Sequence, residues 1–99
     1  MPCGYGDLSQ FNYENYYAEK FKVNSTTPYS KNIKTVLSRE GNLGHIRNYG
    51  SAGIAVSING GLNIFVGQNN NLDLLGACVS TIDITTASTG NIDVSLYVK

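Results

Sequence analysis

Charged residues are scarce in this sequence. They make up 14% of the 99 residues, and seven basic residues balance seven acidic ones, whereas a globular domain usually carries about 25%. Such a chain has little electrostatic repulsion to keep copies apart. A domain of this size also leaves much of its surface exposed after folding. We therefore expect contacts with other proteins, including contacts between copies in a homo-oligomer.

Long apolar runs are absent as well. No segment approaches the roughly 18 apolar residues of a membrane span. Residues 1–10 (MPCGYGDLSQ) lack the basic start and the apolar stretch of a secretory signal. We expect no membrane partner, and we expect the protein to be made in a cytoplasm and not secreted.

Residues that commonly carry chemistry are few. Cys3 and Cys78 form no CxxC motif and are expected to be free thiols in a cytoplasm, and His45 is the single histidine. A structural zinc site normally takes four ligands, and no catalytic partner can be assigned to His45. Three aspartates recur every ten residues from Asp73, but they follow the strand repeat and gather in no calcium loop. The sequence predicts no enzyme, no cofactor and no metal.

Aromatic side chains gather in residues 1–19, among Asn, Gln, Ser and Gly. Disordered segments are poor in aromatics, because exposed rings leave apolar surface in water. We interpret this segment as an N-terminal arm that lies on its own domain or on a neighbouring subunit, and the sequence leaves both open. A short helix over residues 11–21 would place several rings on one face. The predicted partner-binding residues of the arm are Tyr5, Phe11, Tyr13, Tyr16 and Tyr17.

From residue 20 the apolar pattern has a period of two, which is typical of strands. Strands are predicted around Phe21, over residues 33–38 and over residues 43–50, with a turn at TTPYS. The clearest hairpin joins residues 54–58 to residues 62–66 through Asn-Gly-Gly, residue types that tolerate positive φ. Its two strands are expected to cover one core with Ile54, Val56, Ile58, Leu62, Ile64 and Val66.

The remaining chain continues this pattern. Residues 82 and 84 are predicted to point inward, and the last strand alternates Ile92, Val94, Leu96 and Val98 with polar residues. About seven or eight short strands with turns every 8 to 12 residues or so indicate an all-β fold. We predict a single antiparallel β-sandwich, jelly-roll or Ig-like, over residues 20–99.

Basic residues concentrate between residues 20 and 47. Six of them face one acidic residue, Glu40, which gives this stretch a net charge of +5. The neutral whole argues against a general nucleic-acid binder, and complementary faces between proteins explain the asymmetry at least as well. The predicted partner-binding residues of this basic segment are Lys20, Lys22, Lys31, Lys34, Arg39 and Arg47.

Residues 52–99 combine an Asn-Gly hairpin, a polar loop, a Thr-rich strand and a final strand ending in LYVK. This series resembles the C-terminal β-sandwich portions of small tailed-bacteriophage virion proteins, such as capsid decoration and auxiliary head proteins. The resemblance implies a structural, non-enzymatic protein of the virion that binds coat or other virion proteins. The alternative is a carbohydrate-binding or adhesion module of a tail fibre, because Tyr and Asn stack on and hydrogen-bond to sugars. A small enzyme is a third class.

Overall fold

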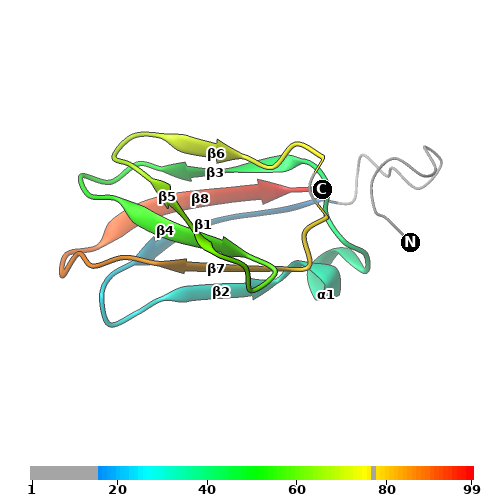
Figure 1. Cartoon of the computed structure of the whole chain (residues 1–99), viewed down its shortest axis with the longest axis horizontal. Coiled ribbons are helices and arrows are strands. Elements are labelled where there is room, and N and C mark those ends of the chain that lie inside the picture. The colour runs from blue at the N-terminus through cyan, green and yellow to red at the C-terminus, as the bar shows by residue number, and fades with distance from the viewer. Residues whose placement is uncertain (1–15, 77) are drawn as a thin grey trace.

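The chain folds into two four-stranded antiparallel sheets that pack on each other as a β-sandwich (Figure 1). The computed structural model describes residues 16–76 and 78–99. The first sheet has the order β1-β8-β3-β6 and the second has the order β2-β7-β4-β5. The strands are β1 (Tyr17–Val23), β2 (Tyr29–Asn32), β3 (Gly44–Asn48), β4 (Ile54–Ile58), β5 (Asn63–Val66), β6 (Asn71–Asp73), β7 (Thr81–Thr85) and β8 (Ile92–Val98). The predicted all-β sandwich is confirmed.

The core lies between the sheets and consists mainly of aliphatic side chains from alternate strand positions, to which Ile33, Leu37, Leu74 and Val79 add from outside the strands. Strands β7 and β8 supply it as predicted, because every second residue of each is buried and the residues between are more exposed. The two strands occupy interior positions of their sheets.

No helix within residues 16–76 and 78–99 has the length and the apolar character that a membrane-spanning helix requires.

The tight turn between β4 and β5 explains part of the Asn-Gly-Gly sequence. Asn59 (φ 55°) and Gly60 (φ 73°) are both left-handed, and the Gly61 N–H donates to the Ile58 carbonyl oxygen at 2.9 Å. Two left-handed residues in succession match the twist of the flanking strands. The positive φ is therefore confined to the first two residues of the triplet. The Asn59 side chain also binds the start of β7 and the residues before it, through the Cys78 carbonyl and the N–H groups of Ser80 and Thr81.

The second strand of this hairpin does not cover the core as the sequence predicts. The register pairs Ser57 with Asn63, so Leu62 is an extra residue beyond the turn and forms a bulge. Its side chain is 92% exposed. Ile64 does share a face with Val56, but it lies on an edge strand and stays 42% exposed. Val66 alone of the three apolar residues predicted for this strand is buried.

The strand predicted over residues 33–38 is wrong. Residues 33 to 37 form the short helix α1 (Ile33–Leu37), which follows β2 directly. The Asn32 side chain caps the helix by accepting from the Thr35 N–H at 3.0 Å, an arrangement that favours a helix start. Ile33 and Leu37 are one turn apart and both buried. Residues 33 and 37 fall on one face both in a helix, as an i, i+4 pair, and in a strand with a period of two. The apolar pattern therefore could not distinguish the helix from a strand.

The helix predicted over residues 11–21 is also wrong where it can be compared, because β1 begins at Tyr17. Tyr17, Ala18 and Glu19 therefore belong to the sandwich and not to the arm. Seven consecutive residues of β1 pair with β8, and these ladder hydrogen bonds outweigh a weak helical periodicity in a Tyr- and Asn-rich segment. Residues 11–15 lie outside the described residues.

Cys78 is disulfide-bonded, which corrects the free thiol expected from the sequence. That expectation was based on the compartment of synthesis alone. Cys3 lies outside the described residues.

We expect Gly60→Ala to lower the free energy of unfolding by about 1 kcal/mol, because the Cβ atom of an L-residue makes a left-handed backbone conformation less favourable. A Cβ atom at Gly60 meets no heavy atom within 4 Å, so the cost comes from the backbone alone. Urea denaturation of Gly60→Ala measures this cost. Gly90→Ala is the control, because its Cβ atom meets no heavy atom closer than the Ser88 Oγ at 3.9 Å and its φ is not positive, so it should cost less. Equal stability of Gly60→Ala and the parent chain would contradict a backbone cost at Gly60.

Candidate binding face

The outer face of the first sheet gathers aromatic and cationic side chains from three strands. The register places Ala18, Tyr97 and His45 side by side in one row across the sheet. The next row contains Lys20, Ser95 and Arg47. In the third row Lys22 lies opposite Asp93, and the Tyr49 N–H donates to the Asp93 carbonyl oxygen at 2.9 Å. We call this surface the tyrosine face and define it by Tyr16, Lys20, Lys22, His45, Arg47, Tyr49, Asp93, Ser95 and Tyr97.

One end of the tyrosine face is a row of rings. The Tyr97 ring lies with its centroid 5.6 Å from that of Tyr16 and 5.7 Å from that of His45. These separations are typical of aromatic pairs in contact. Tyr16 is 53% exposed, and the His45 side chain is exposed too. The rings therefore present a continuous aromatic strip to solvent.

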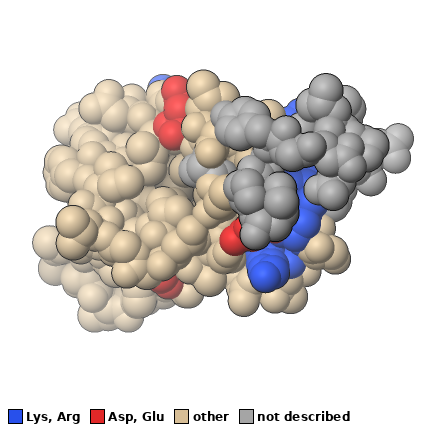
Figure 2. All heavy atoms as spheres, turned by 45° about the vertical axis from the view of Figure 1, so that its right-hand side comes forward, with Lys and Arg blue, Asp and Glu red and all other residues tan. Residues whose placement is uncertain are grey.

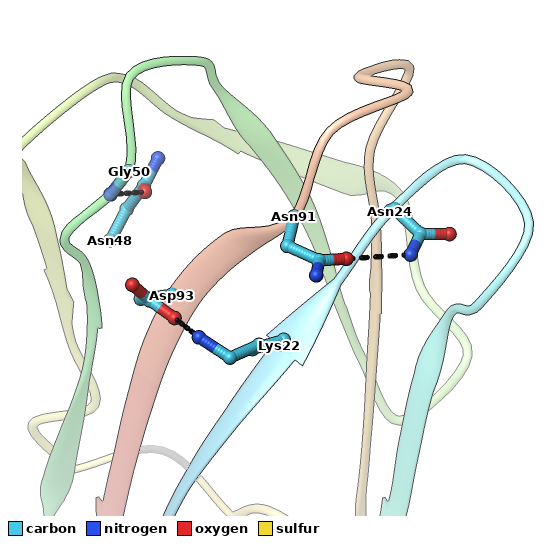
Figure 3. A network of polar contacts seen from close by, with 6 residues as sticks. All are labelled: Lys22, Asn24, Asn48, Gly50, Asn91 and Asp93. Carbon is cyan, nitrogen blue, oxygen red and sulfur yellow. Dashed lines mark hydrogen bonds and ion pairs between the residues drawn. The ribbon is translucent and has the colours of Figure 1, made fainter.

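The other end combines a ring with charged groups. The Arg47 guanidinium lies 5.2 Å from the centroid of the Tyr49 ring, within cation–π range, and Tyr49 is 51% exposed. Lys22 and Asp93 form an ion pair at 2.5 Å between β1 and β8 (Figure 3). Both of these side chains are 62% exposed, so the pair contributes little to stability. The pair places two opposite charges in the same hollow as Tyr49.

Two shallow hollows lie on this surface. Both are lined partly by residues of β8, the strand between β1 and β3. One, of about 330 Å³, is lined by residues that include His45, Ser95 and Tyr97. The other, of about 460 Å³, is lined by residues that include Lys22, Tyr49 and Asp93. Lys20 lines both hollows. No hydrogen bond or ion pair joins the Lys20 ammonium to any residue that the structure describes, so this cation is available to a ligand.

The structure divides the predicted basic segment between several surfaces. Lys20, Lys22 and Arg47 meet on the tyrosine face, although Arg47 is far from the two lysines in the sequence. The other three lie elsewhere: Lys31 in β2, Lys34 in α1, and Arg39 after α1, where it donates to the Glu40 carbonyl oxygen at 3.2 Å. In Figure 2 most of the visible surface is uncharged, and most of the visible Lys and Arg atoms gather at one end.

A second cluster, the edge cluster, joins β1 of the first sheet to β2 of the second. The Glu19 carboxylate accepts hydrogen bonds from the Tyr17 hydroxyl at 2.6 Å and the Tyr29 hydroxyl at 2.7 Å. Lys31 lies 3.8 Å from the same carboxylate. The rings of Phe21 and Tyr29 stack with centroids 3.6 Å apart. These five residues close one open side of the sandwich.

The edge cluster shifts the ionisation of its members. The hydrogen bond from Tyr17, followed by that from Tyr29 and the charge of Lys31, lowers the pKa of Glu19 despite the opposing effect of burial. Burial first, and then the hydrogen bond to Glu19, raise the pKa of Tyr29 far above its ordinary range. The cluster therefore favours a charged Glu19 and a neutral Tyr29.

Two of the five predicted arm residues fall within the described part of the chain, and they have different roles. Tyr16 lies on the tyrosine face, whereas Tyr17 points to the opposite side of β1 and binds Glu19 in the edge cluster. Tyr5, Phe11 and Tyr13 lie outside the described residues. Neighbours in a strand point to opposite faces, which separates Tyr16 from Tyr17.

Sequence reasoning missed Tyr49 as a surface aromatic, and it missed the hydrogen bond between Glu19 and Tyr29. The strand alternation already placed Tyr97 on the outer face, but the register that brings His45 and Arg47 beside it could not be read from the sequence. Residues 16–76 and 78–99 contain no group of three or more His, Cys, Asp or Glu side chains that could hold a metal ion. His45 forms no hydrogen bond or ion pair within the same residues.

Comparisons with known proteins give no match: no protein-family model matches the chain, and neither curated proteins nor solved structures show significant similarity to it.

We expect Glu19→Gln to lower the free energy of unfolding by roughly 1 kcal/mol at about pH 7, since a neutral amide accepts weaker hydrogen bonds than a partly exposed carboxylate. The pKa of Glu19 is lower in the folded state than its usual 4.5. Its stabilising contribution is therefore present above that value and is lost as the pH falls through the lowered pKa. The difference from the parent chain should disappear in acid.

Urea denaturation of both proteins over the acid range measures this dependence. Asp73→Asn is the matched control, because it removes a carboxylate from the exposed end of β6. A stability difference for Glu19→Gln that persists unchanged at about pH 2, where carboxylates are protonated, would contradict the role assigned to the charge.

Proposed function

We propose that the protein is a non-enzymatic structural protein of a virus particle, an auxiliary or decoration protein that binds the coat proteins of a bacteriophage capsid. It is made in the host cytoplasm and joins the virion there. The tyrosine face is its docking surface on the coat.

The observation that carries this proposal is the composition of the tyrosine face. Tyr and Arg are enriched among the residues that dominate binding energy at protein interfaces. Tyr49 and Tyr16 are each more than half exposed, and Arg47 lies against the Tyr49 ring. Arg47 lies in β3, and Tyr16 and Tyr49 directly adjoin β1 and β3, so little backbone entropy is lost when these side chains bind.

The resemblance of residues 52–99 to small phage virion proteins supports the same function. This region contains β4 to β8, which supply strands to both sheets. The resemblance therefore concerns the framework on which the tyrosine face is built, and β8 contributes Asp93, Ser95 and Tyr97 directly to that face.

A second candidate, a carbohydrate-binding or adhesion module of a tail fibre, is favoured by the spacing of the rings. Tyr97 and Tyr49 lie in rows separated by four residues along β8, which is about 13 Å at a rise of ~3.3 Å per residue. A short oligosaccharide stacks its sugar rings on aromatic side chains and places its hydroxyl groups on polar ones. The polar side chains of Ser95 and Lys20 lie in the row between the two tyrosines, where they would hydrogen-bond to the sugar hydroxyl groups.

We predict that the purified full-length chain co-sediments with capsids assembled without it, and that Tyr49→Ala weakens this binding by about tenfold or more, the effect of an interface anchor. Quantitative mass spectrometry of the pelleted capsids gives the number of bound copies at each protein concentration. Thr85→Ala is the control, because Thr85 is exposed on the outer face of the second sheet, and it should bind like the parent chain.

Two results would overturn the capsid proposal: no copies in the pellet, or equal binding by Tyr49→Ala and the parent chain. A glycan array probed with the parent chain and with Tyr97→Ala tests the second candidate. Binding to a defined glycan that is lost in Tyr97→Ala would replace the coat protein with a carbohydrate as the ligand of this face.

A further inference from the structure

Strand β5 leaves one edge of the second sheet open. It is the last strand in the order β2-β7-β4-β5 and pairs with β4 along one side. The backbone N–H and C=O groups on its other side face away from the sheet. An edge of this kind is a template for another strand.

The side chains of this edge are apolar and exposed. Phe65 is 75% exposed on the outer face of the sheet, opposite Ala55. Ile64 is 42% exposed on the inner face, and the bulged Leu62 is 92% exposed. Edge strands of proteins that remain monomeric usually carry a charge or a proline to prevent pairing. Strand β5 contains neither.

The neutral surroundings of β5 indicate which partner suits it. The chain contains no charged residue from Asn48 to Leu72, a stretch that includes all of β4 and β5. Two copies of this edge can therefore approach each other without bringing like charges together. A partner selected by charge would find nothing complementary here, whereas an identical neutral edge meets no repulsion.

We propose that two copies of the chain associate through their β5 strands, which pair antiparallel across a twofold axis and join the two second sheets into one continuous sheet. In an antiparallel pair, residues directly opposite each other share a face. A twofold axis through Phe65 sets Phe65 against Phe65 of the second copy on the outer face. Ile64 then lies opposite Val66 of the second copy on the inner face, where it extends the core.

The geometry favours this twofold pairing because the contact is isologous, so the same patch serves both copies and the assembly closes as a dimer. Each β5 supplies the donors and acceptors that the other lacks. The tyrosine face lies on the outer side of the other sheet, so the dimer leaves both docking surfaces exposed. The pairing does not depend on what the tyrosine face binds.

The test is sedimentation equilibrium of the full-length chain over the micromolar to millimolar range. The parent chain should show a monomer–dimer equilibrium. Phe65→Lys should be monomeric, because it places two ammonium groups against each other at the axis. Leu75→Lys is the matched control: it adds the same charge at a residue that is 79% exposed and lies outside β5, and it should dimerise like the parent chain.

A mixture of two variants tests the twofold axis itself. Phe65→Lys and Phe65→Glu should each be monomeric, and an equimolar mixture should form a heterodimer, since opposite charges then meet at the axis. Circular dichroism establishes that both variants remain folded. A parent chain that stays monomeric throughout, dimerisation of Phe65→Lys alone, or a mixture that remains monomeric would overturn the proposal.

Discussion

The pairing of β8 with both β1 and β3 is the constraint on which the rest of this structure depends. Its seven residues match β1 along their whole length and match β3 at five positions. The same strand supplies four aliphatic side chains to the core and three polar or aromatic ones to the tyrosine face. Since β8 (Ile92–Val98) pairs with β1 (Tyr17–Val23), the first sheet joins segments about 70 residues apart in the sequence. Contacts between such distant segments are slow to form but cooperative once made.

The sequence was most informative where alternation alone decides the structure. Residues 81–85 and 92–98 are flanked by turns and lie in the interior of sheets, so their period of two translates directly into buried and exposed faces. Alternation failed where a local interaction competes with it. The cap formed by Asn32 converts the following residues into α1, and the bulge at Leu62 takes that residue out of the hairpin ladder. Each effect depends on only one or two residues, so it does not change the apolar periodicity of the sequence.

The candidate site was less predictable than the fold, because it depends on register between distant strands. Six basic residues close in the sequence were interpreted as one surface, yet strand alternation and the passage from one sheet to the other separate them.

The role of a buried polar side chain was equally unpredictable from the sequence. Asn48 is fully buried, accepts from the Gly50 N–H, and donates to the carbonyl oxygens of Ala52, Val66 and Gly67. These bonds fix the connection from β3 of the first sheet to β4 of the second, and Figure 3 shows the contact with Gly50. An asparagine at the end of a predicted strand carries no sign of this role.

The sandwich thus forms a frame held together by β8, which leaves exposed the two surfaces that we propose for binding: the tyrosine face on one sheet and the β5 edge of the other. Hydrogen–deuterium exchange of the backbone amides in the full-length chain tests this frame most directly. The account predicts that the amides of β8 are among the slowest to exchange, opening only with global unfolding, while those of the turn at residues 67–70 exchange fast. Exchange in β8 as fast as in that turn, with β7 still protected, would contradict it.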